Sequence, residues 1–105
     1  MPKQRETIFA ERVDRDLKEA FGKDVHITNI QQRAKAGDPD RIICLRGNFI
    51  AIELKVKGGV LSEMQKVKLS RIANSGGRIF VATPETWNFV LYEIKAIYER
   101  ELYKT

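Results

Sequence analysis

Apolar residues recur at helical spacing in three separate parts of the chain. Such spacing places them on one face of a helix, so each segment predicts an amphipathic helix packed against a core. The segments run from Arg5 to Phe21, from Ser62 to about Asn74, and from Glu85 to about Leu102. The predicted inner positions are Phe9, Val13, Leu17, Ala20 and Phe21 in the first helix, Leu69, Ile72 and Ala73 in the second, and Trp87, Leu91, Ile94, Tyr98 and Leu102 in the third.

Residues that favour helix ends stand at these boundaries. Gly22 follows the first segment, and glycine is common where a helix stops. Ser62 and Gln65 have the spacing of a capping box, in which each side chain binds a backbone N–H of the first turn. Thr83-Pro84 precedes the third segment, and proline suits the first position of a helix.

The remaining apolar segments are short and predict strands. Val25 to Ile30 alternates apolar and polar residues, and Arg78 to Ala82 is a brief apolar run. Arg41 to Ala51 predicts a β-hairpin, because Gly47-Asn48 tolerates the positive φ of a two-residue turn. The order is therefore helix, three strands, helix, strand, helix. A right-handed crossover places the last strand beside the hairpin, so residues 1–105 are predicted to form one α/β domain with a mixed sheet.

The predicted hairpin brings three charged side chains together. A turn at Gly47-Asn48 pairs Asp40 with Lys55, and strand alternation then puts Asp40, Glu53 and Lys55 on one face. Asp40 and Glu53 become diagonal neighbours, roughly 7–8 Å apart at the backbone. Two carboxylates at that separation can converge on one divalent cation. The alternative is a solvated cross-strand salt bridge worth about 0–1 kcal/mol.

Composition and charge narrow the function classes. Hydrophobic residues make up 43% and charged residues 31% of the chain, which is typical of a folded globular protein. The net charge of +5 favours a polyanionic partner, of which nucleic acid is the simplest. No apolar run approaches the ~20 residues of a membrane helix, and Met1 to Glu6 lack a signal-peptide core, so a cytoplasmic protein without membrane association is expected. The single cysteine, Cys44, falls mid-strand and is predicted to be a small buried hydrophobe.

A catalytic metal usually takes a further oxygen ligand from the protein, and the first helix carries several acidic residues that could supply it. Glu6 falls in the same angular sector as Phe9 and Val13, whereas Glu11 points to nearly the opposite side and is expected to face water. A carboxylate on an apolar stripe needs a partner, which a bound cation would supply. The alternative is that Glu6 is solvated at the helix start, where it interacts favourably with the helix dipole.

These residues resemble the virus-type replication-repair nuclease (VRR-NUC) domain of the PD-(D/E)XK nuclease superfamily. The family's Gly-x-Pro-Asp corresponds to Gly37-Asp38-Pro39-Asp40, and its Glu-x-Lys corresponds to Glu53-Leu54-Lys55 after the aliphatic Ile50-Ala51-Ile52. Its helix-borne glutamine corresponds to Gln65. Its N-terminal helix acid corresponds to Glu6, with Glu11 as the second choice. Asp38 is a departure, because the family is often apolar there.

The resemblance implies a restriction-endonuclease-like αβββαβα core and a metal-dependent nuclease that acts on DNA. Asp40, Glu53 and the Leu54 carbonyl would then hold Mg²⁺ or Mn²⁺, and Glu6 would complete the ligand set. Lys55 would orient the attacking water or stabilise charge on the phosphate. Gln65 would bind a water, a phosphate or Lys55. A capping role beside Ser62 is compatible with any of these.

Contacts to DNA are expected from the basic loop and from a lysine that flank this site. The residues are Gln31, Arg33, Lys35 and Lys57, and ordinary solvated loop charge is the alternative for each. His26, the single histidine, is expected to be a strand or surface residue rather than a catalytic one. Family resemblance also implies a homodimer. Phe89 and Tyr92 of the third helix are aromatic residues outside its apolar stripe. They suggest a dimer contact surface on that helix, and packing on the sheet is the alternative.

Three functions of different classes follow. The first is a metal-dependent endonuclease for branched or structured DNA, similar to Holliday-junction-resolving enzymes. The second is a DNA- or RNA-binding module that keeps the fold without cutting, against which the combination of Asp40, Glu53 and Lys55 argues. The third is a sequence-reading restriction-type nuclease, for which the chain is small and lacks a recognition motif.

Overall fold

The computed structural model describes residues 4–30, 37–56 and 58–104. The chain forms, in order, α1 (Arg5–Phe21), the short 3₁₀ helix η1 (Gly22–Asp24), β1 (Val25–Asn29), β2 (Arg41–Leu45), β3 (Asn48–Leu54), α2 (Glu63–Asn74), β4 (Arg78–Ala82) and α3 (Trp87–Leu102). This order of the main helices and strands confirms the one predicted from the apolar pattern.

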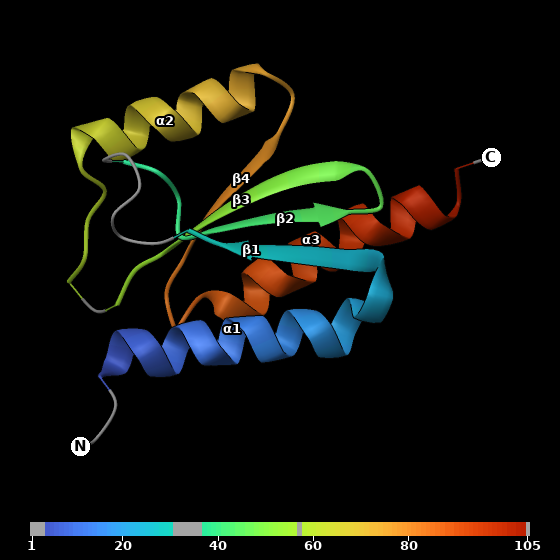
Figure 1. Cartoon of the computed structure of the whole chain (residues 1–105), viewed down its shortest axis with the longest axis horizontal. Coiled ribbons are helices and arrows are strands. Elements are labelled where there is room, and N and C mark those ends of the chain that lie inside the picture. Colours follow the sequence, from blue (N-terminus) through green and yellow to red (C-terminus); the bar gives the residue numbers. More distant parts are fainter. Residues whose placement is uncertain (1–3, 31–36, 57, 105) are drawn as a thin grey trace.

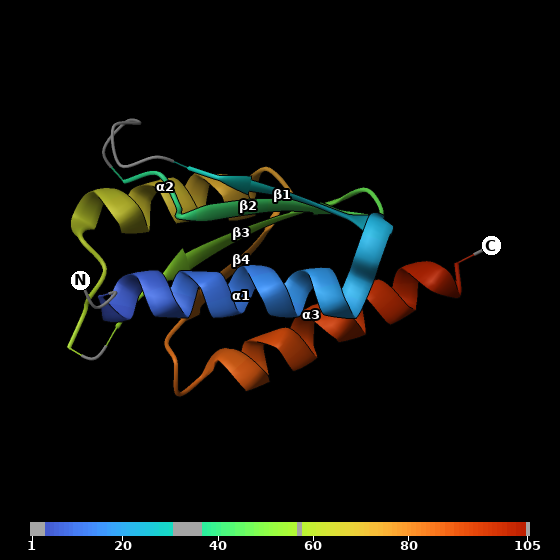
Figure 2. The ribbon, with the colours of Figure 1, turned by 60° about the horizontal axis from the view of Figure 1, so that its bottom comes forward.

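The four strands form one mixed sheet in the order β1-β2-β3-β4. The first three are antiparallel to their neighbours, and β4 pairs parallel to β3 because α2 carries the chain back across the sheet. Helices α1 and α3 cover one face of this sheet, and α2 lies on the other (Figures 1 and 2). The α/β fold with a mixed central sheet is therefore confirmed.

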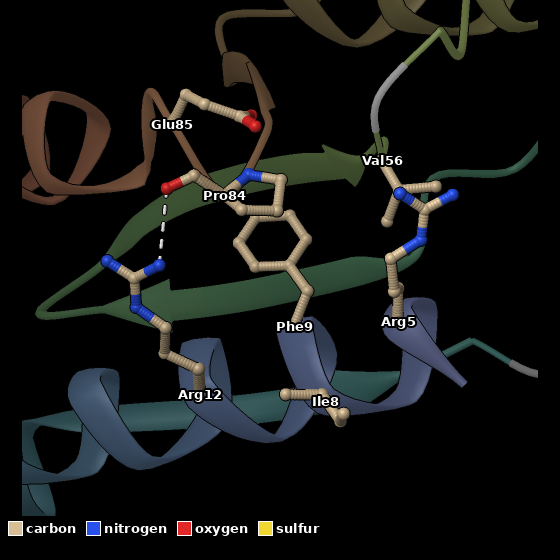
Figure 3. Close-up of a pocket in the computed structure, with 7 residues that line it drawn as sticks. All are labelled: Arg5, Ile8, Phe9, Arg12, Val56, Pro84 and Glu85. Carbon is tan, nitrogen blue, oxygen red and sulfur yellow. Dashed lines mark hydrogen bonds between the residues drawn. The ribbon is translucent and has the colours of Figure 1, made fainter. Parts of the chain in front are cut away.

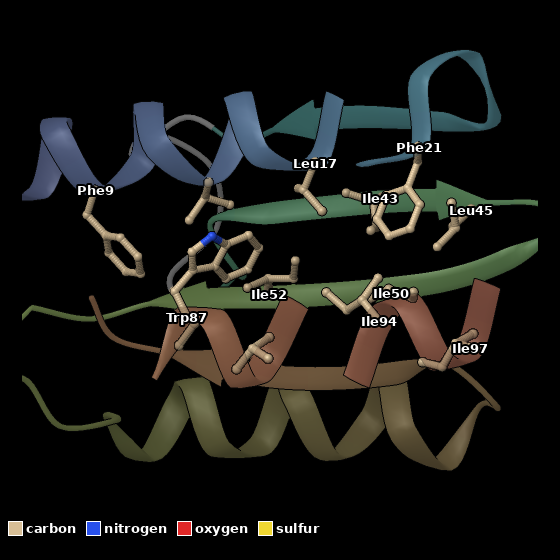
Figure 4. Close-up of a cluster of buried hydrophobic side chains, with 13 residues drawn as sticks. Phe9, Leu17, Phe21, Ile43, Leu45, Ile50, Ile52, Trp87, Ile94 and Ile97 are labelled. Carbon is tan, nitrogen blue, oxygen red and sulfur yellow. The ribbon is translucent and has the colours of Figure 1, made fainter. Parts of the chain in front are cut away.

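The hydrophobic core lies between the sheet and the layer formed by α1 and α3 (Figure 4). The stripe predicted on α1 is buried there, and it meets the strand residues of one parity, such as Ile43, Leu45, Ile50 and Ile52. From α3, the buried residues are Trp87, Val90, Ile94 and Ile97. Side chains of the other parity, such as Ala51 and Glu53, therefore point toward the side of α2.

The hairpin turn lies one residue earlier than predicted. Leu45 pairs with Asn48, so the two turn residues are Arg46 and Gly47, at φ 47° and 88°. Positive φ at both positions is the type I′ geometry that suits a two-residue hairpin. The Asn48 side chain closes the turn by donating to the Leu45 carbonyl at 3.2 Å. The predicted pairing of Asp40 with Lys55 is therefore wrong by two residues, and Asp40 continues the ladder opposite Glu53, one step beyond the pair of Arg41 with Ile52.

Three further predictions are corrected. Helix α3 begins at Trp87 rather than Glu85, because Thr83 and Thr86 exchange backbone-to-hydroxyl bonds of 2.9 and 3.2 Å and hold Pro84 in a preceding turn. Of its predicted inner residues, Trp87 and Ile94 are buried and Leu91 and Tyr98 pack partly buried against the core, whereas Leu102 is 47% exposed. Cys44 is exposed rather than buried, because α2 packs mainly on β4 and leaves the β1–β2 part of that face uncovered.

Candidate functional site

The predicted catalytic residues meet where β3 ends. Glu53 is the second-last residue of β3, Lys55 follows that strand, Asp40 immediately precedes β2, and Gln65 is in the first turn of α2. The register differs from the predicted one by two residues, an even number, so strand alternation still keeps Asp40, Glu53 and Lys55 on one face. That face is the one on which α2 lies (Figure 1).

Glu53, Lys55 and Gln65 form a closed triangle of polar contacts. The Lys55 Nζ lies 3.1 Å from Glu53 Oε2 and donates to Gln65 Oε1 at 3.0 Å. The Gln65 Nε2 donates to the same Glu53 oxygen at 2.6 Å. Gln65 Oε1 also accepts the Ser62 N–H at 2.9 Å, and Ser62 Oγ accepts the Gln65 N–H, so the predicted capping box is present as well. One glutamine therefore both caps α2 and fixes two charged side chains.

Asp40 adds a second carboxylate to the triangle. Its Oδ2 accepts the backbone N–H of Leu54 at 2.8 Å, which fixes the carboxylate against the end of β3. Glu53 is only 3% exposed. Burial, and next the negative charge of Asp40, raise the pKa of Glu53 to about 6, against the lowering influence of Lys55. Two carboxylates therefore lie together with a single ammonium group.

The loop before Asp40 needs glycine at its first position. Gly37 has φ +87°, and a Cβ there would lie 2.5 Å from Met64 Cγ and 2.8 Å from the Met64 carbonyl oxygen. The loop thus passes directly against the start of α2, which carries Gln65. Asp38, the departure from the family pattern, is ion-paired with Lys68 of α2 at 2.8 Å. Both contacts fix the loop that presents Asp40.

A groove of about 420 Å³ opens beside Asp40 on the α1 side. Glu6, Glu11 and Asp14 line it from α1, and Asp40 and Leu54 line it from the sheet. Glu6 is exposed rather than buried in the stripe that follows it. Glu11 is also exposed, as predicted, yet it borders the same groove. Both candidate helix acids therefore face the site region.

An ion pair that the sequence analysis missed lies on the opposite face from Glu53. The Arg41 guanidinium donates to both Asp14 oxygens, at 2.8 and 3.1 Å, and to the Asp40 carbonyl at 2.9 Å. Arg41 is 9% exposed. The sequence did hold a signal for this burial, because Arg41 lies two and four residues before the core residues Ile43 and Leu45 and so points to the same face of the strand. This pair joins α1 to the strand start that carries Asp40.

The donor set suits a hard divalent cation that keeps waters. Within the described ranges, no three His, Cys, Asp or Glu side chains group closely enough to form a metal site by themselves. Mg²⁺ commonly takes one or two carboxylates together with waters and substrate phosphate oxygens. Asp40 and Glu53 are two such carboxylates, and their mutual repulsion shows excess negative charge that a cation would neutralise. The residues present therefore fit Mg²⁺ or Mn²⁺.

Several predicted residues lie elsewhere. Gln31, Arg33, Lys35 and Lys57 fall outside the described residues. His26 is an exposed residue of β1, as expected. Phe89 and Tyr92 are 66% and 68% exposed on α3 and do not pack on the sheet. In the part of the chain that the structure describes, no helix is both long and apolar enough to span a membrane.

Comparison with known proteins identifies the fold. No protein-family model matches the chain, and no curated protein matches it. The structure is similar to a solved structure described as "VRR_NUC domain", with a TM-score of 0.60 and 23% sequence identity over 79% of this chain and 92% of the other. At this identity the likeness concerns the fold alone. It confirms the VRR-NUC fold that the short motifs implied.

Proposed function

We propose that the protein is a Mg²⁺- or Mn²⁺-dependent deoxyribonuclease that cuts phosphodiester bonds in branched or otherwise structured DNA. The observation that carries this proposal is the meeting of Asp40, Glu53, Lys55 and Gln65 at the end of β3, beside an open groove. The VRR-NUC fold and the net charge of +5 support it further.

In this proposal Asp40, Glu53 and the Leu54 carbonyl hold the cation, and Glu6 of α1 completes the set from across the groove. When bound, the cation lowers the pKa of a water and neutralises charge on the phosphate. Asp40 needs no rearrangement for this role, because the Leu54 N–H already orients its carboxylate. Such preorganisation is what electrostatic catalysis requires.

Lys55 acts on the phosphate rather than as the base. Its ammonium group is held between Glu53 and Gln65, and its side chain retains 18% exposure, so it can face a bound phosphate without leaving the triangle. There it stabilises the charge that develops on the phosphate oxygens. Gln65 keeps both partners in position, because its amide donates to Glu53 and its carbonyl oxygen accepts from Lys55.

The two neighbouring carboxylates, Asp40 and the buried Glu53, favour an enzyme over a DNA-binding module. A site that only bound the DNA backbone would gain nothing from Asp40 and from Glu53, which is 3% exposed, because both repel phosphate. Backbone contacts in our proposal come instead from Gln31, Arg33, Lys35 and Lys57, which makes binding salt-dependent and largely independent of sequence.

A substrate panel tests the proposal. Purified protein is incubated with a four-way junction, a duplex of matching sequence and the single strands, in Mg²⁺, in Mn²⁺ or in EDTA. We expect metal-dependent cutting of the junction in preference to the duplex. Retarded migration without cleavage in either metal would identify a binding module instead. Cutting of plain duplex at one defined sequence would identify a restriction-type enzyme.

We propose in addition that the protein acts as a homodimer joined through α3. Phe89 and Tyr92 are exposed on that helix, three residues apart and thus on neighbouring positions of one face. Light scattering should give the mass of a dimer for the wild type and of a monomer for a Phe89→Asp, Tyr92→Asp variant. A monomeric wild type that still cuts junctions would remove the dimer and leave the nuclease.

A further inference from the structure

A second pocket lies next to the groove beside Asp40, at the N-terminal half of α1. Phe9 and Val56 line both cavities, so the two share a wall. Figure 3 shows this pocket between α1 and the Pro84 turn, with Val56 at one side. A strand whose phosphate lies in the groove would therefore have its next nucleotide at the pocket.

The pocket has an apolar wall and the size of one small ring system. Ile8, Phe9, Val56 and Pro84 form the wall, and Ile8 is 54% exposed there. The volume is about 290 Å³, close to the ~300 Å³ at the lower limit of pockets that hold small molecules. A duplex cannot enter such a space, whereas a single planar base can.

Two arginines stand on either side of the Phe9 ring (Figure 3). Arg12 is already engaged, since it donates to the Pro84 carbonyl and to Asn88 Oδ1, both at 3.2 Å. Arg12 is also paired with Asp16, 3.9 Å away, and Glu85 borders the pocket. The Arg5 side chain is exposed, and no hydrogen bond or ion pair joins it to another described side chain. Arg5 therefore offers a guanidinium with no charged partner among the described residues next to an apolar wall, which matches the two halves of a nucleotide.

We propose that this pocket receives one unpaired base of the substrate strand, adjacent to the phosphate in the groove, while Arg5 contacts the neighbouring phosphate. This inference rests on the proposed nuclease and narrows its substrate class to DNA with an unpaired nucleotide beside the cut, such as a flap, a bulge or an open junction. A paired base would have to leave the stack first, which disfavours intact duplex.

The test uses the fluorescent base 2-aminopurine in EDTA, where no cleavage is needed. One duplex carries it as a single unpaired nucleotide, and a second carries it paired. Because 2-aminopurine emits more strongly outside the base stack, we expect its emission to rise with protein only in the first duplex. The first duplex should also bind more tightly than the second.

Two variants probe the pocket, each with a matched control. Ile8→Ser should weaken binding of the unpaired duplex roughly fivefold to tenfold, through loss of apolar contact with the base. Val67→Ser, at an exposed apolar position of α2, is its control. Arg5→Ala should lower the slope of log affinity against log salt by about 0.7, as expected for one lost phosphate contact to a single strand. Arg15→Ala, with a side chain 60% exposed on the same helix, controls for lost charge and should leave that slope closer to wild type.

The outcomes separate this inference from the nuclease proposal. Equal emission from the two duplexes, or variants that keep the wild-type preference for the unpaired one, would overturn base capture even if the protein cuts DNA in Mg²⁺. If the protein captures the unpaired base but cleaves no DNA in Mg²⁺ or Mn²⁺, the base-binding pocket is supported and the nuclease proposal is contradicted.

Discussion

Two charged clusters flank the start of β2, one on each face of the sheet, and they differ in charge balance. On the α1 side, the Arg41 guanidinium binds both oxygens of Asp14, so one positive charge meets one negative charge. On the other side, Glu53 is paired with Lys55 and is also repelled by the nearby Asp40, so two carboxylates meet one ammonium group. Asp40 and Arg41 are adjacent in the chain, so strand alternation alone separates the balanced pair from the unbalanced one.

The difference assigns a stabilising role to the balanced cluster and, in our proposal, the chemistry to the unbalanced one. A balanced, doubly hydrogen-bonded pair is satisfied without any ligand, and it joins α1 to the sheet. An excess carboxylate in a poorly solvated position destabilises the unliganded fold. The raised pKa of Glu53 reflects this unfavourable charge. The sheet therefore carries a stabilising contact directly behind the site that, in our proposal, a cation completes.

The largest expected effect separates the clusters by activity. Asp40→Asn should reduce DNA cleavage below detection, since it removes a proposed metal ligand. It should keep or increase the free energy of unfolding, because it also removes the repulsion with Glu53. Gel assays in Mg²⁺ and urea unfolding in EDTA measure the two quantities. Cleavage near the wild-type rate would remove Asp40 from the mechanism.

Breaking the balanced pair should mainly lower the free energy of unfolding rather than the rate of cleavage. Arg41→Met leaves Asp14 without its partner and is expected to lower the free energy of unfolding by about 3 kcal/mol, the lower part of the range for broken buried pairs. Changing both partners, as Asp14→Leu with Arg41→Met, should recover much of that loss because no unpaired charge remains. Urea denaturation of the single and double variants gives the comparison. A double variant as unstable as Arg41→Met alone would contradict a purely electrostatic cause.

The unbalanced cluster should also make stability depend on pH. Since the pKa of Glu53 is raised from 4.5 to about 6, the folded protein binds the proton more tightly than the unfolded chain does. The resulting stabilisation is fully present below pH 4.5 and is lost as the pH rises through about 6. A shift of this size corresponds to about 2 kcal/mol.

Urea unfolding in EDTA across this pH range, for the wild type and for Glu53→Gln, isolates the contribution of Glu53. As the pH rises through about 6, the free energy of unfolding of the wild type should fall relative to that of Glu53→Gln. Added Mg²⁺ should then stabilise the wild type more than the variant at pH 7, because in our proposal the ionised carboxylate holds the cation. Parallel curves for the two proteins in EDTA would show that Glu53 titrates normally.

The same contrast explains what could be predicted from sequence. The apolar stripe of α1 and the face shared by Asp40, Glu53 and Lys55 followed from periodicity, which depends on parity and survives a register error of two residues. The turn position did not follow, because Arg46 adopts a positive φ that side chains other than glycine, asparagine and aspartate rarely take.

Contacts between distant segments were beyond the sequence pattern. The pairing of Arg41 with Asp14 joins residues of two elements that each appear simply charged, and their mutual approach depends on how α1 packs. Exposure of Cys44 depends likewise on how much of one sheet face α2 covers. Gln65 could be assigned two roles from sequence, and the structure contains the contacts for both.

The smallest effect separates those two roles of Gln65. Ser62→Ala removes the hydroxyl that accepts the Gln65 N–H and should cost about 1 kcal/mol of stability, the usual value for a lost N-cap. Cleavage should remain near wild type, because the contacts of Gln65 with Glu53 and Lys55 do not involve that hydroxyl. Gln65→Ala should cost similar stability through the same capping box and, in addition, slow cleavage roughly 10–100-fold, as for residues that orient metal ligands. Single-turnover cleavage at saturating protein, measured beside urea unfolding, distinguishes the two variants. If both slowed cleavage equally, the glutamine would act on the site only by holding the start of α2.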